Sequence, residues 1–287
     1  MLQRIFDYKL EESKLMIDNC VSVIQKSKEA MPLVHCLTNP ITSYVCAGMI
    51  LAAGGRPIMA EHPREVEEIT AQADALLINL GNISDSKMDA MRLSAVVASE
   101  KGIPIVLDAV GVGCSHLRLK FAFQLLKFCK PAILKGNRSE IIALCLGDTT
   151  CRGVDAEAGD LEASSRILAK KAQFLAKQYG TVVMVSGPTD IIASQESVFR
   201  CENGTPLMGK VCGTGCMLGA LAAAYSSRNQ PIPTALTAVL AMGIAGERAS
   251  CGVASGSFPA RLLDEVSGLC EESLRKQAKF YRMEAQA

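Results

Sequence analysis

The sequence contains no tryptophan, and aromatic residues occupy only 5% of its 287 positions. Few side chains are therefore available to stack on the bases of a nucleic acid. The sequence also lacks an excess of either charge, because 30 lysines and arginines balance 29 aspartates and glutamates to a net charge of +1. This balance argues against a nucleic-acid partner or a membrane partner held by general electrostatic attraction.

No continuous apolar segment opens the chain, and charged residues interrupt its first ten positions, unlike a secretory signal. The most apolar stretch, 231–246, is shorter than a bilayer span and rich in small residues, which predicts a buried core helix. An apolar content of 49% excludes disorder for most of the chain. We therefore expect a folded cytoplasmic protein.

Twelve cysteines are many for this length, yet no two of them form a Cys-x-x-Cys pair. Zinc sites use closely paired ligands, and disulfide scaffolds are typical of small secreted domains, so neither is indicated. Most of the cysteines lie in apolar segments, where a reduced cysteine is a small buried hydrophobe. The three histidines show no metal-ligand spacing, and His35 is expected to be a hydrogen-bonded core residue.

Helix and strand patterns alternate along most of the chain. The expected strands are 33–37, 57–60, 75–81, 103–108, 132–134 and 181–186, and the expected helices are 11–30, 41–53, 63–73, 86–101, 117–129, 139–146 and 161–179. The strands are continuous apolar runs, which is typical of a parallel sheet covered on both faces. A polar stretch runs to residue 159, an antiparallel extension is expected over 190–200, and the chain after 209 is expected to be nearly all helix.

These patterns predict one three-layer α/β/α domain over residues 1–287, with a mostly parallel central sheet, a short antiparallel extension and an N-terminal helical segment over 1–30. In such folds, ligands bind at the carboxyl ends of the strands. That rule selects Asn39, Met59, 79–82, Asp108, 135–137 and 186–187, where polar residues and glycines collect.

Two carboxylates among these positions could hold a hydrated magnesium ion. Asp108 ends one strand and Glu140 follows another, and Mg²⁺ commonly uses one or two carboxylates together with substrate phosphates. The structural alternatives are a helix cap or salt bridge for Asp108, and a first-turn acidic residue for Glu140. We expect both carboxylates to be wet, so that removing their charge changes stability little.

The segment 212–216, Cys-Gly-Thr-Gly-Cys, precedes a long apolar helix. Its N–H groups, at Gly213, Thr214 and Gly215, and the helix dipole would favour an anion. The same position would stabilise an ionised thiol, so Cys216 is a candidate thiolate. The structural alternative is a glycine-rich start of a helix with Cys216 packed inside.

Two other glycine motifs carry less information. The segment 204–211 nearly matches a phosphate-binding loop, but Val211 has no hydroxyl for magnesium, and Pro206 removes an N–H group. The pair Gly111 and Gly113 lacks the third glycine of a dinucleotide-binding motif. Neither is adopted as a site.

Taken in order, eight segments resemble one known family. They are Pro32–Asn39, Gly54–Met59, Ala75–Gly81, Leu107–Gly113, Ile133–Glu140, Val185–Gly187, Gly213–Cys216 and Ala245–Ala249. Over roughly residues 32 to 260 the chain resembles the hydroxyethylthiazole kinases of the ribokinase-like superfamily. The resemblance implies a ribokinase-like fold and ATP-dependent phosphorylation of 4-methyl-5-(2-hydroxyethyl)thiazole in thiamine biosynthesis or salvage.

The resemblance also implies a role for each candidate residue. Met59 and Gly213 would contact the thiazole, with Asn39 in a substrate-side motif. Lys135 and Ser186 match nucleotide-binding positions, and Asp108 and Glu140 match positions associated with magnesium and phosphates. Cys216 stands where most ribokinase-like kinases carry an aspartate base. The family is known as a homotrimer with active sites between subunits.

Three positions depart from the pattern of the family. Lys135 stands where bacterial members often have arginine, Ser186 where threonine is common, and Ala109 where proline is usual. None of these changes removes a needed chemical group, although lysine contacts phosphate as a point charge rather than as a fork. The alternatives are another ribokinase-like kinase, acting on hydroxymethylpyrimidine or a carbohydrate, and a non-catalytic thiazole or nucleotide sensor.

Overall fold

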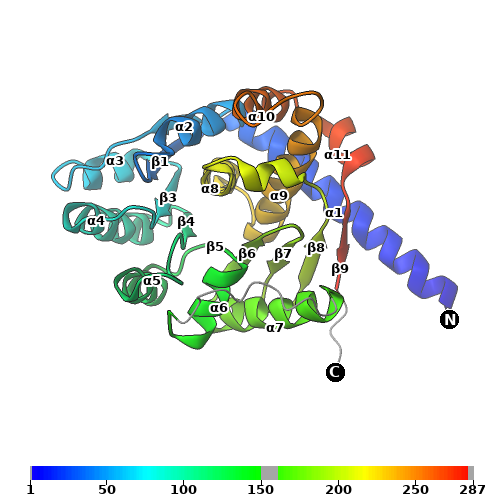
Figure 1. Cartoon of the computed structure of the whole chain (residues 1–287), viewed down its shortest axis with the longest axis horizontal. Helices are drawn as coiled ribbons and strands as arrows, with labels where there is room; N and C mark the ends of the chain where they lie inside the picture. Colours follow the sequence, from blue (N-terminus) through cyan, green and yellow to red (C-terminus); the bar gives the residue numbers. More distant parts are fainter. Residues whose placement is uncertain (1, 150–160, 284–287) are drawn as a thin grey trace.

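The computed structural model describes residues 2–149 and 161–283, and in these residues nine strands form one sheet (Figure 1). The strands are β1 (Leu33–Leu37), β2 (Arg56–Ile58), β3 (Ala75–Asn79), β4 (Ile105–Asp108), β5 (Ile133–Asn137), β6 (Val182–Ser186), β7 (Asp190–Ala193), β8 (Val198–Cys201) and β9 (Phe280–Arg282). Their order is β2-β1-β3-β4-β5-β6-β7-β8-β9. The first six pair in parallel, and β7, β8 and β9 pair antiparallel at one edge.

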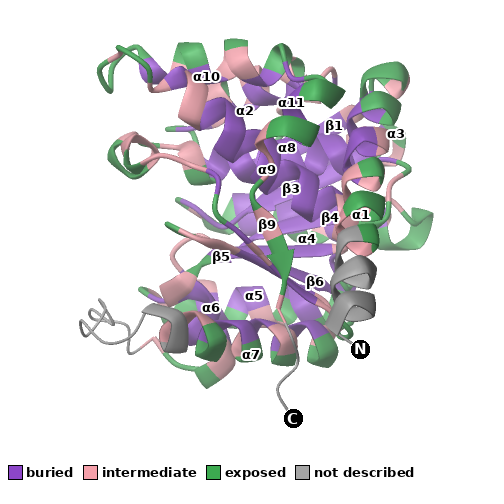
Figure 2. Ribbon diagram, turned by 90° about the vertical axis from the view of Figure 1, so that its right-hand side faces the viewer, coloured by how far each residue is buried: buried purple, intermediate pink, exposed green. Residues whose placement is uncertain are grey.

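Helices cover both faces of the sheet. They are α1 (Leu2–Ala30), α2 (Ser43–Ala52), α3 (Val66–Gln72), α4 (Asp85–Lys101), α5 (His116–Cys129), α6 (Arg138–Leu146), α7 (Leu161–Tyr179), α8 (Thr214–Ser226), α9 (Pro231–Ala249), α10 (Phe258–Ser267) and α11 (Glu271–Gln277). One apolar core lies between the sheet and α1, α2, α8, α9 and α10, and a second lies between the sheet and α3 to α7. Figure 2 shows the buried strands between these two layers. The predicted three-layer architecture is confirmed.

The strands are apolar throughout because both of their faces are covered. In β3, Leu77 packs into the first core, whereas its neighbours Leu76 and Ile78 pack into the second. All five residues of this strand are buried. The continuous apolar runs seen in the sequence therefore correspond to parallel strands between two helical layers, as expected.

The prediction of a nearly all-helical chain after residue 209 is wrong at one point, because Phe280–Arg282 forms the edge strand β9 on β8. The Phe280 ring lies 6.3 Å from that of Phe199 on β8, so β9 is held by packing as well as by pairing. Most of the predicted polar stretch before residue 159 lies outside the described residues. Among the described helices, none is both long and apolar enough to cross a membrane.

Two glycines of α9 fix the segment that leads into α8. A Cβ on Gly243 would lie 2.6 Å from the Cβ of Asn203, and one on Gly246 would lie 2.7 Å from the sulfur of Met208. At Gly243 the Cβ would also meet the backbone of Asn203, so glycine is required there, whereas at Gly246 the Met208 side chain would have to move. The carbonyl of Met208 then accepts the Thr214 hydroxyl at 2.9 Å, which anchors the first residue of α8.

Candidate active site

Three polar side chains lie next to one another at the carboxyl ends of three adjacent strands. Asn79 of β3 is the register partner of Asp108 of β4, and Asp108 is the partner of Lys135 of β5. Register partners in a parallel sheet project from the same face. Two residues earlier on β3, Leu77 packs into the core that contains α8, so the three polar side chains face α8 as well.

The carboxylate of Asp108 binds both of its neighbours. One oxygen accepts from Lys135 Nζ at 2.8 Å, and the other accepts from Asn79 Nδ2 at 3.0 Å. Asp108 is 0% exposed and Lys135 3% exposed, so they form a buried ion pair. The expectation of a wet carboxylate at Asp108 is wrong, and the salt bridge that the sequence offered as the structural alternative is present.

Cys216 lies in the first turn of α8 and faces this pair. Its sulfur accepts an N–H from Asn79 at 3.3 Å and another from Asn39 at 3.7 Å. Helix α8 approaches closely at Gly219, where a Cβ would lie only 3.1 Å from an oxygen of Asp108. The predicted catalytic cysteine and substrate-side Asn39 are thus brought together, and Cys216 is 9% exposed.

Burial and charge set the ionisation of this cluster. Burial raises the pKa of Asp108 to about 6, although Lys135 opposes the change. Burial alone would lower the pKa of Lys135, but the charge and hydrogen bond of Asp108 together with the charge of Glu140 outweigh it, so that the pKa is raised. Burial, and then the charge of Asp108, raise the pKa of Cys216, while the Thr42 hydroxyl and Lys135 oppose this. At neutral pH, Asp108 is ionised and Cys216 is mainly a thiol.

Glu140 lies at the start of α6 and holds two loops together. Its oxygens accept from the N–H of Gly111 at 2.8 Å and from the N–H of Asn137 at 2.7 Å, and the second contact is part of a capping box. Glu140 is buried, so the expectation that it is wet is also wrong. It has the structural role of a first-turn acidic residue that the sequence suggested.

Two carboxylates near the strand ends fit a magnesium ion that is held together with phosphates. Each oxygen of Asp108 and Glu140 already accepts one protein hydrogen bond, but a carboxylate oxygen has a second lone pair. No group of three or more acidic, histidine or cysteine side chains that could hold a metal occurs in the described residues. The donor set therefore suits an ion that keeps water and phosphate ligands.

The start of α8 has the geometry of an anion-binding site. Gly213 precedes the helix with φ of +93°, a left-handed conformation that glycine adopts without strain. The first N–H groups of a helix have no carbonyl one turn earlier to accept them. Because the Thr214 hydroxyl is bonded to Met208, only the backbone N–H of Thr214 can serve a ligand.

Met59 follows β2 on a segment that two buried side chains hold in place. His35 Nε2 lies 2.8 Å from the carbonyl of Ala60, and Lys87 Nζ lies 2.9 Å from a carboxylate oxygen of Glu61. Met59 packs against the core cluster to which Cys216 belongs. The expectation that His35 is a hydrogen-bonded core residue is confirmed, since Thr70 contacts its other nitrogen at 2.8 Å.

Ser186 ends β6 and is the register partner of Asn137. It lies at the carboxyl ends of the strands, as Asp108 and Lys135 do, although no hydrogen bond joins Ser186 to either of them among the described residues. The turn after Ser186 is fixed by Asp190, which accepts the N–H of Gly187 at 2.9 Å. The near match to a phosphate-binding loop forms a 3-10 helix, Pro206–Lys210, as suits a motif rejected on its sequence.

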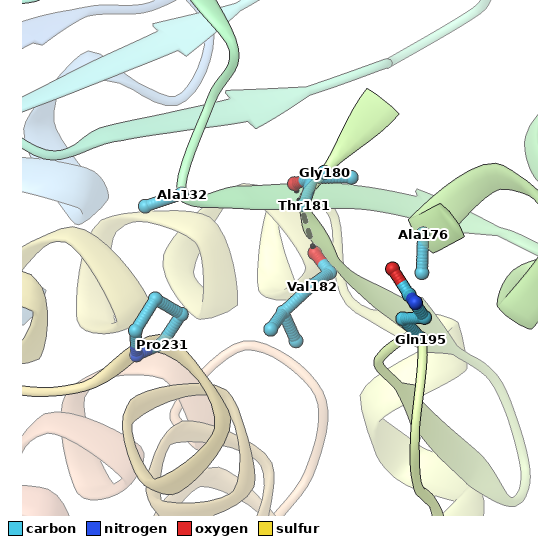
Figure 3. A pocket seen from close by; sticks show the side chains of 7 residues that line it. All are labelled: Ala132, Ala176, Gly180, Thr181, Val182, Gln195 and Pro231. Carbon is cyan, nitrogen blue, oxygen red and sulfur yellow. Dashed lines mark hydrogen bonds between the residues drawn. The ribbon is translucent and has the colours of Figure 1, made fainter. Parts of the chain in front are cut away.

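A pocket of about 280 Å³ lies at the other end of the strands, away from Asp108 and Cys216 (Figure 3). It is lined by Ala132, Ala176, Gly180, Thr181, Val182, Gln195 and Pro231. Ala132 and Thr181 precede β5 and β6, so the pocket lies at the amino ends of the strands. Its lining is mostly apolar and includes no charged side chain, so it does not compete with the Cys216 cluster as a catalytic site.

Asn79 was selected from the sequence only as one of several polar residues at strand ends, yet it contacts both Asp108 and Cys216. The signal that could have singled it out is Gly81. A Cβ at Gly81 would lie 2.9 Å from Asn79 Oδ1 and 3.0 Å from Asn39 Nδ2. Glycine at this position leaves room for the two amides beside the thiol.

Comparison with known proteins points to one family. The model of the "Hydroxyethylthiazole kinase family" matches residues 24–272. "Hydroxyethylthiazole kinase 2" of Clostridium botulinum (strain 657 / Type Ba4) is 39% identical over 262 residues, which are 91% of this chain and 99% of the relative. "Hydroxyethylthiazole kinase 1" of Methanosphaera stadtmanae is 35% identical over 284 residues, covering 94% of this chain and 100% of the relative.

The comparison with solved structures points to the same family as the comparison of sequences. A hydroxyethylthiazole kinase protein from Pyrococcus horikoshii OT3 has a TM-score of 0.84 and 32% identity, and the match covers 92% of this chain and 99% of that one. A ribokinase-like superfamily protein from Enterococcus faecalis V583 has a TM-score of 0.62 at 14% identity, with 85% and 89% covered. At that identity the second likeness concerns the fold alone, and the ribokinase-like fold is confirmed.

Proposed function

Because the chain belongs to the hydroxyethylthiazole kinase family, we propose that it uses ATP to phosphorylate the primary alcohol of 4-methyl-5-(2-hydroxyethyl)thiazole in thiamine biosynthesis and salvage. The observation that carries the proposal is the position of Cys216, whose thiol faces Asp108 and Lys135 at the start of a glycine-flanked helix. A proton acceptor and an anion site thereby lie next to each other.

Cys216 acts as the general base in this reaction. The alcohol oxygen forms a bond to the γ-phosphorus, its proton passes to the thiolate sulfur of Cys216, and the bond from γ-phosphorus to the β–γ bridging oxygen breaks to leave ADP. The N–H groups of Gly213, Thr214 and Gly215 hold the transferring phosphoryl oxygens. Phosphoryl transfer depends mainly on such positioning and charge stabilisation.

The nucleotide lies along the carboxyl ends of the strands, where Lys135 and Ser186 are found. Ser186 provides a hydroxyl, and Lys135 has N–H donors beyond the one given to Asp108. Asp108 and Glu140 would hold magnesium, directly or through water, and the ion would offset the charge of the phosphates. Lys135 thus balances negative charge on Asp108 and on the phosphates alike.

Met59 and Gly213 contact the thiazole ring, and Asn39 lies beside its hydroxyethyl group. Gly213 is a poor position for a test, since a Cβ there would lie 3.0 Å from Thr42 and φ is +93°. Met59 is better, because its thioether suits a small heteroaromatic ring.

We expect Met59→Ala to raise the KM for the thiazole alcohol about tenfold, in keeping with the loss of roughly 1–3 kcal/mol of ring contact, while kcat and the KM for ATP change little. Steady-state kinetics with each substrate varied in turn measure both constants. Met88→Ala, a buried methionine on α4, is the matched control for lost packing. Equal KM values for thiazole in the wild type and Met59→Ala would refute the placement.

The chain is proposed to act as a single domain in a homotrimer with active sites between subunits. The turn before α2 and the first turn of that helix support this, because Ile41 is 74% exposed and Tyr44 is 86% exposed within five residues of Asn39. Leu51, exposed on the same helix, extends this apolar strip by two turns from Tyr44. A neighbouring chain that covered the strip would adjoin the site, because Thr42 lies so close to Gly213 that a Cβ there would be 3.0 Å from it.

We expect Tyr44→Glu to convert the trimer into single chains of 30.5 kDa and to lower kinase activity. Light scattering across a dilution series gives the molar mass, and activity is followed at the same concentrations. Phe128→Glu, at an exposed residue of α5, is the control for added charge. A wild type that has the mass of one chain at every concentration would contradict the trimer.

An ADP-release assay with candidate acceptors separates the possible activities. The proposal predicts ADP release that depends on the thiazole alcohol and not on hydroxymethylpyrimidine or a carbohydrate. Other ribokinase-like kinases usually carry aspartate where Cys216 stands, which is why the thiazole is favoured. A sensor would bind the thiazole, seen as a raised Tm, without releasing ADP.

A further inference from the structure

The side-chain amide of Asn79 uses all of its hydrogen-bonding groups within the site. Its Oδ1 accepts the N–H of Gly81 at 2.9 Å, and its Nδ2 donates to Asp108 Oδ2 at 3.0 Å and to Cys216 Sγ at 3.3 Å. The partners define the orientation, because a backbone N–H can only donate and an ionised carboxylate can only accept. Turning the amide over would place an oxygen against the Asp108 carboxylate.

The amide is also fixed in place. Asn79 is 0% exposed at the end of β3, and Gly81 turns back so that its N–H reaches the amide oxygen. With one N–H held by Asp108, the planar NH₂ group directs its second hydrogen to the sulfur. The carboxylate of Asp108 therefore determines which group the Cys216 thiol meets.

We propose that Asn79 is a positioning residue that holds the sulfur of Cys216 and favours its thiolate form by donating an N–H group that Asp108 and Gly81 orient. The inference deepens the proposed function and rests on Cys216 being the base. It assigns Asn79 a role in proton transfer without contact with substrate.

The charges around Cys216 show why such a donor matters. The titratable groups around the thiol are Asp108 from β4, Lys135 from β5, Cys46 from α2 and Cys36 from β1. The Thr42 hydroxyl also contributes, by favouring the thiolate. Burial and the negative charge of Asp108 both oppose the thiolate. The Asn79 amide lies between the carboxylate and the sulfur, and it presents a positive hydrogen to each.

Substitutions at Asn79 should raise the thiol pKa of Cys216, and the size of the rise should differ between them in a defined order. Asn79→Ala removes the donor, and Asn79→Asp has the same shape but places a carboxylate, which can only accept when ionised, against the sulfur. A hydrogen bond to a charged group corresponds to a shift of about one pH unit or more. We expect the thiol pKa of Cys216 to rise by about one unit in Asn79→Ala and further in Asn79→Asp.

The experiment measures the thiolate directly. Iodoacetamide reacts with the thiolate and not with the thiol, so its rate at Cys216, followed by mass spectrometry of the peptide that contains it, gives the pKa across a pH series. Asn203→Ala is the control, because Asn203 is a buried asparagine that bonds Glu247 and Lys279 away from the thiol. Tm values establish that each variant is folded.

The kinase pH profile is measured in the same variants. The rising limb of kcat should move to higher pH by the same amount as the thiol pKa, and the Asn203→Ala limb should not move.

The outcomes separate the inference from the function on which it rests. Folded Asn79→Ala and Asn79→Asp proteins with the wild-type thiol pKa would overturn the inference. A thiol pKa of Cys216 that is lower in Asn79→Asp than in Asn79→Ala would overturn it as well. A shifted thiol pKa with an unshifted kcat limb would uphold the contact between Asn79 and Cys216 but refute Cys216 as the base. Parallel shifts support both.

Discussion

Replacing Cys216 by alanine is expected to lower kcat about 10²-fold or more, whereas replacing it by aspartate retains or raises kcat. A general base typically contributes about 10²–10⁴-fold, and alanine removes it. Aspartate has a reference pKa of about 3.9, against about 8.5 for cysteine. It is therefore already ionised at a pH where most of the thiol is still protonated, and it can accept the alcohol proton at neutral pH. The amides of Asn39 and Asn79, which now donate to the sulfur, would donate to the new carboxylate.

The pH dependence of kcat gives the same prediction a second readout. Because burial raises the thiol pKa of Cys216, the thiolate fraction at pH 7 is small and grows about tenfold with each pH unit below that pKa. The wild-type rate should therefore rise with pH above neutrality, and the rate of Cys216→Asp should be flat there. ATP binding, which we propose to use the backbone N–H groups at the start of α8, should survive in Cys216→Ala. A fully active Cys216→Ala beside an unfolded Cys216→Asp would show that the cysteine is structural.

The second large effect is expected at the buried ion pair. Asp108→Asn leaves Lys135 charged and buried without its partner, a change that costs about 3–5 kcal/mol and lowers Tm by roughly 5 °C or more in a chain of this length. The variant should also need more magnesium for half-maximal rate, because one of the two carboxylates is lost. Thermal unfolding and a magnesium titration of the rate measure the two effects.

A double variant separates the effect of Asp108 on stability from its effect on kinase activity. Asp108→Asn combined with Lys135→Met removes both charges, so most of the lost stability should return while kinase activity stays low. Glu140→Gln is the matched change at the other carboxylate, where no lysine is left unpaired, and it should raise the magnesium requirement with a smaller fall in Tm. An Asp108→Asn protein with wild-type Tm and wild-type magnesium dependence would contradict both roles of Asp108.

The positions of the parallel strands could be predicted because burial on two faces leaves a local signal. Leu76, Leu77 and Ile78 form an unbroken apolar run, and no polar residue interrupts it until Asn79. The edge strand β9 gave no such signal. Phe280, Tyr281 and Arg282 are too few to show a period, and they form a strand because β8 offers an open edge.

The candidate site was predictable in its composition but not in its burial. The rule for carboxyl ends of strands selected Asp108 and Lys135 separately, and their ion pair joins residues that are 27 positions apart in the chain. Whether a carboxylate at a strand end is wet or buried depends on the helix that packs over it. Here Gly219 lets α8 approach closely, and no local pattern in the strands predicts that contact.

Identification of the product tests the central claim most directly. The protein, ATP, magnesium and the thiazole alcohol are incubated together, and phosphorus NMR and mass spectrometry follow the products. We predict a phosphate monoester on the hydroxyethyl oxygen, formed in a one-to-one ratio with ADP, and no ester from the analogue that lacks the hydroxyl. ADP release without the ester, or tight binding of the thiazole with neither product, would contradict the account.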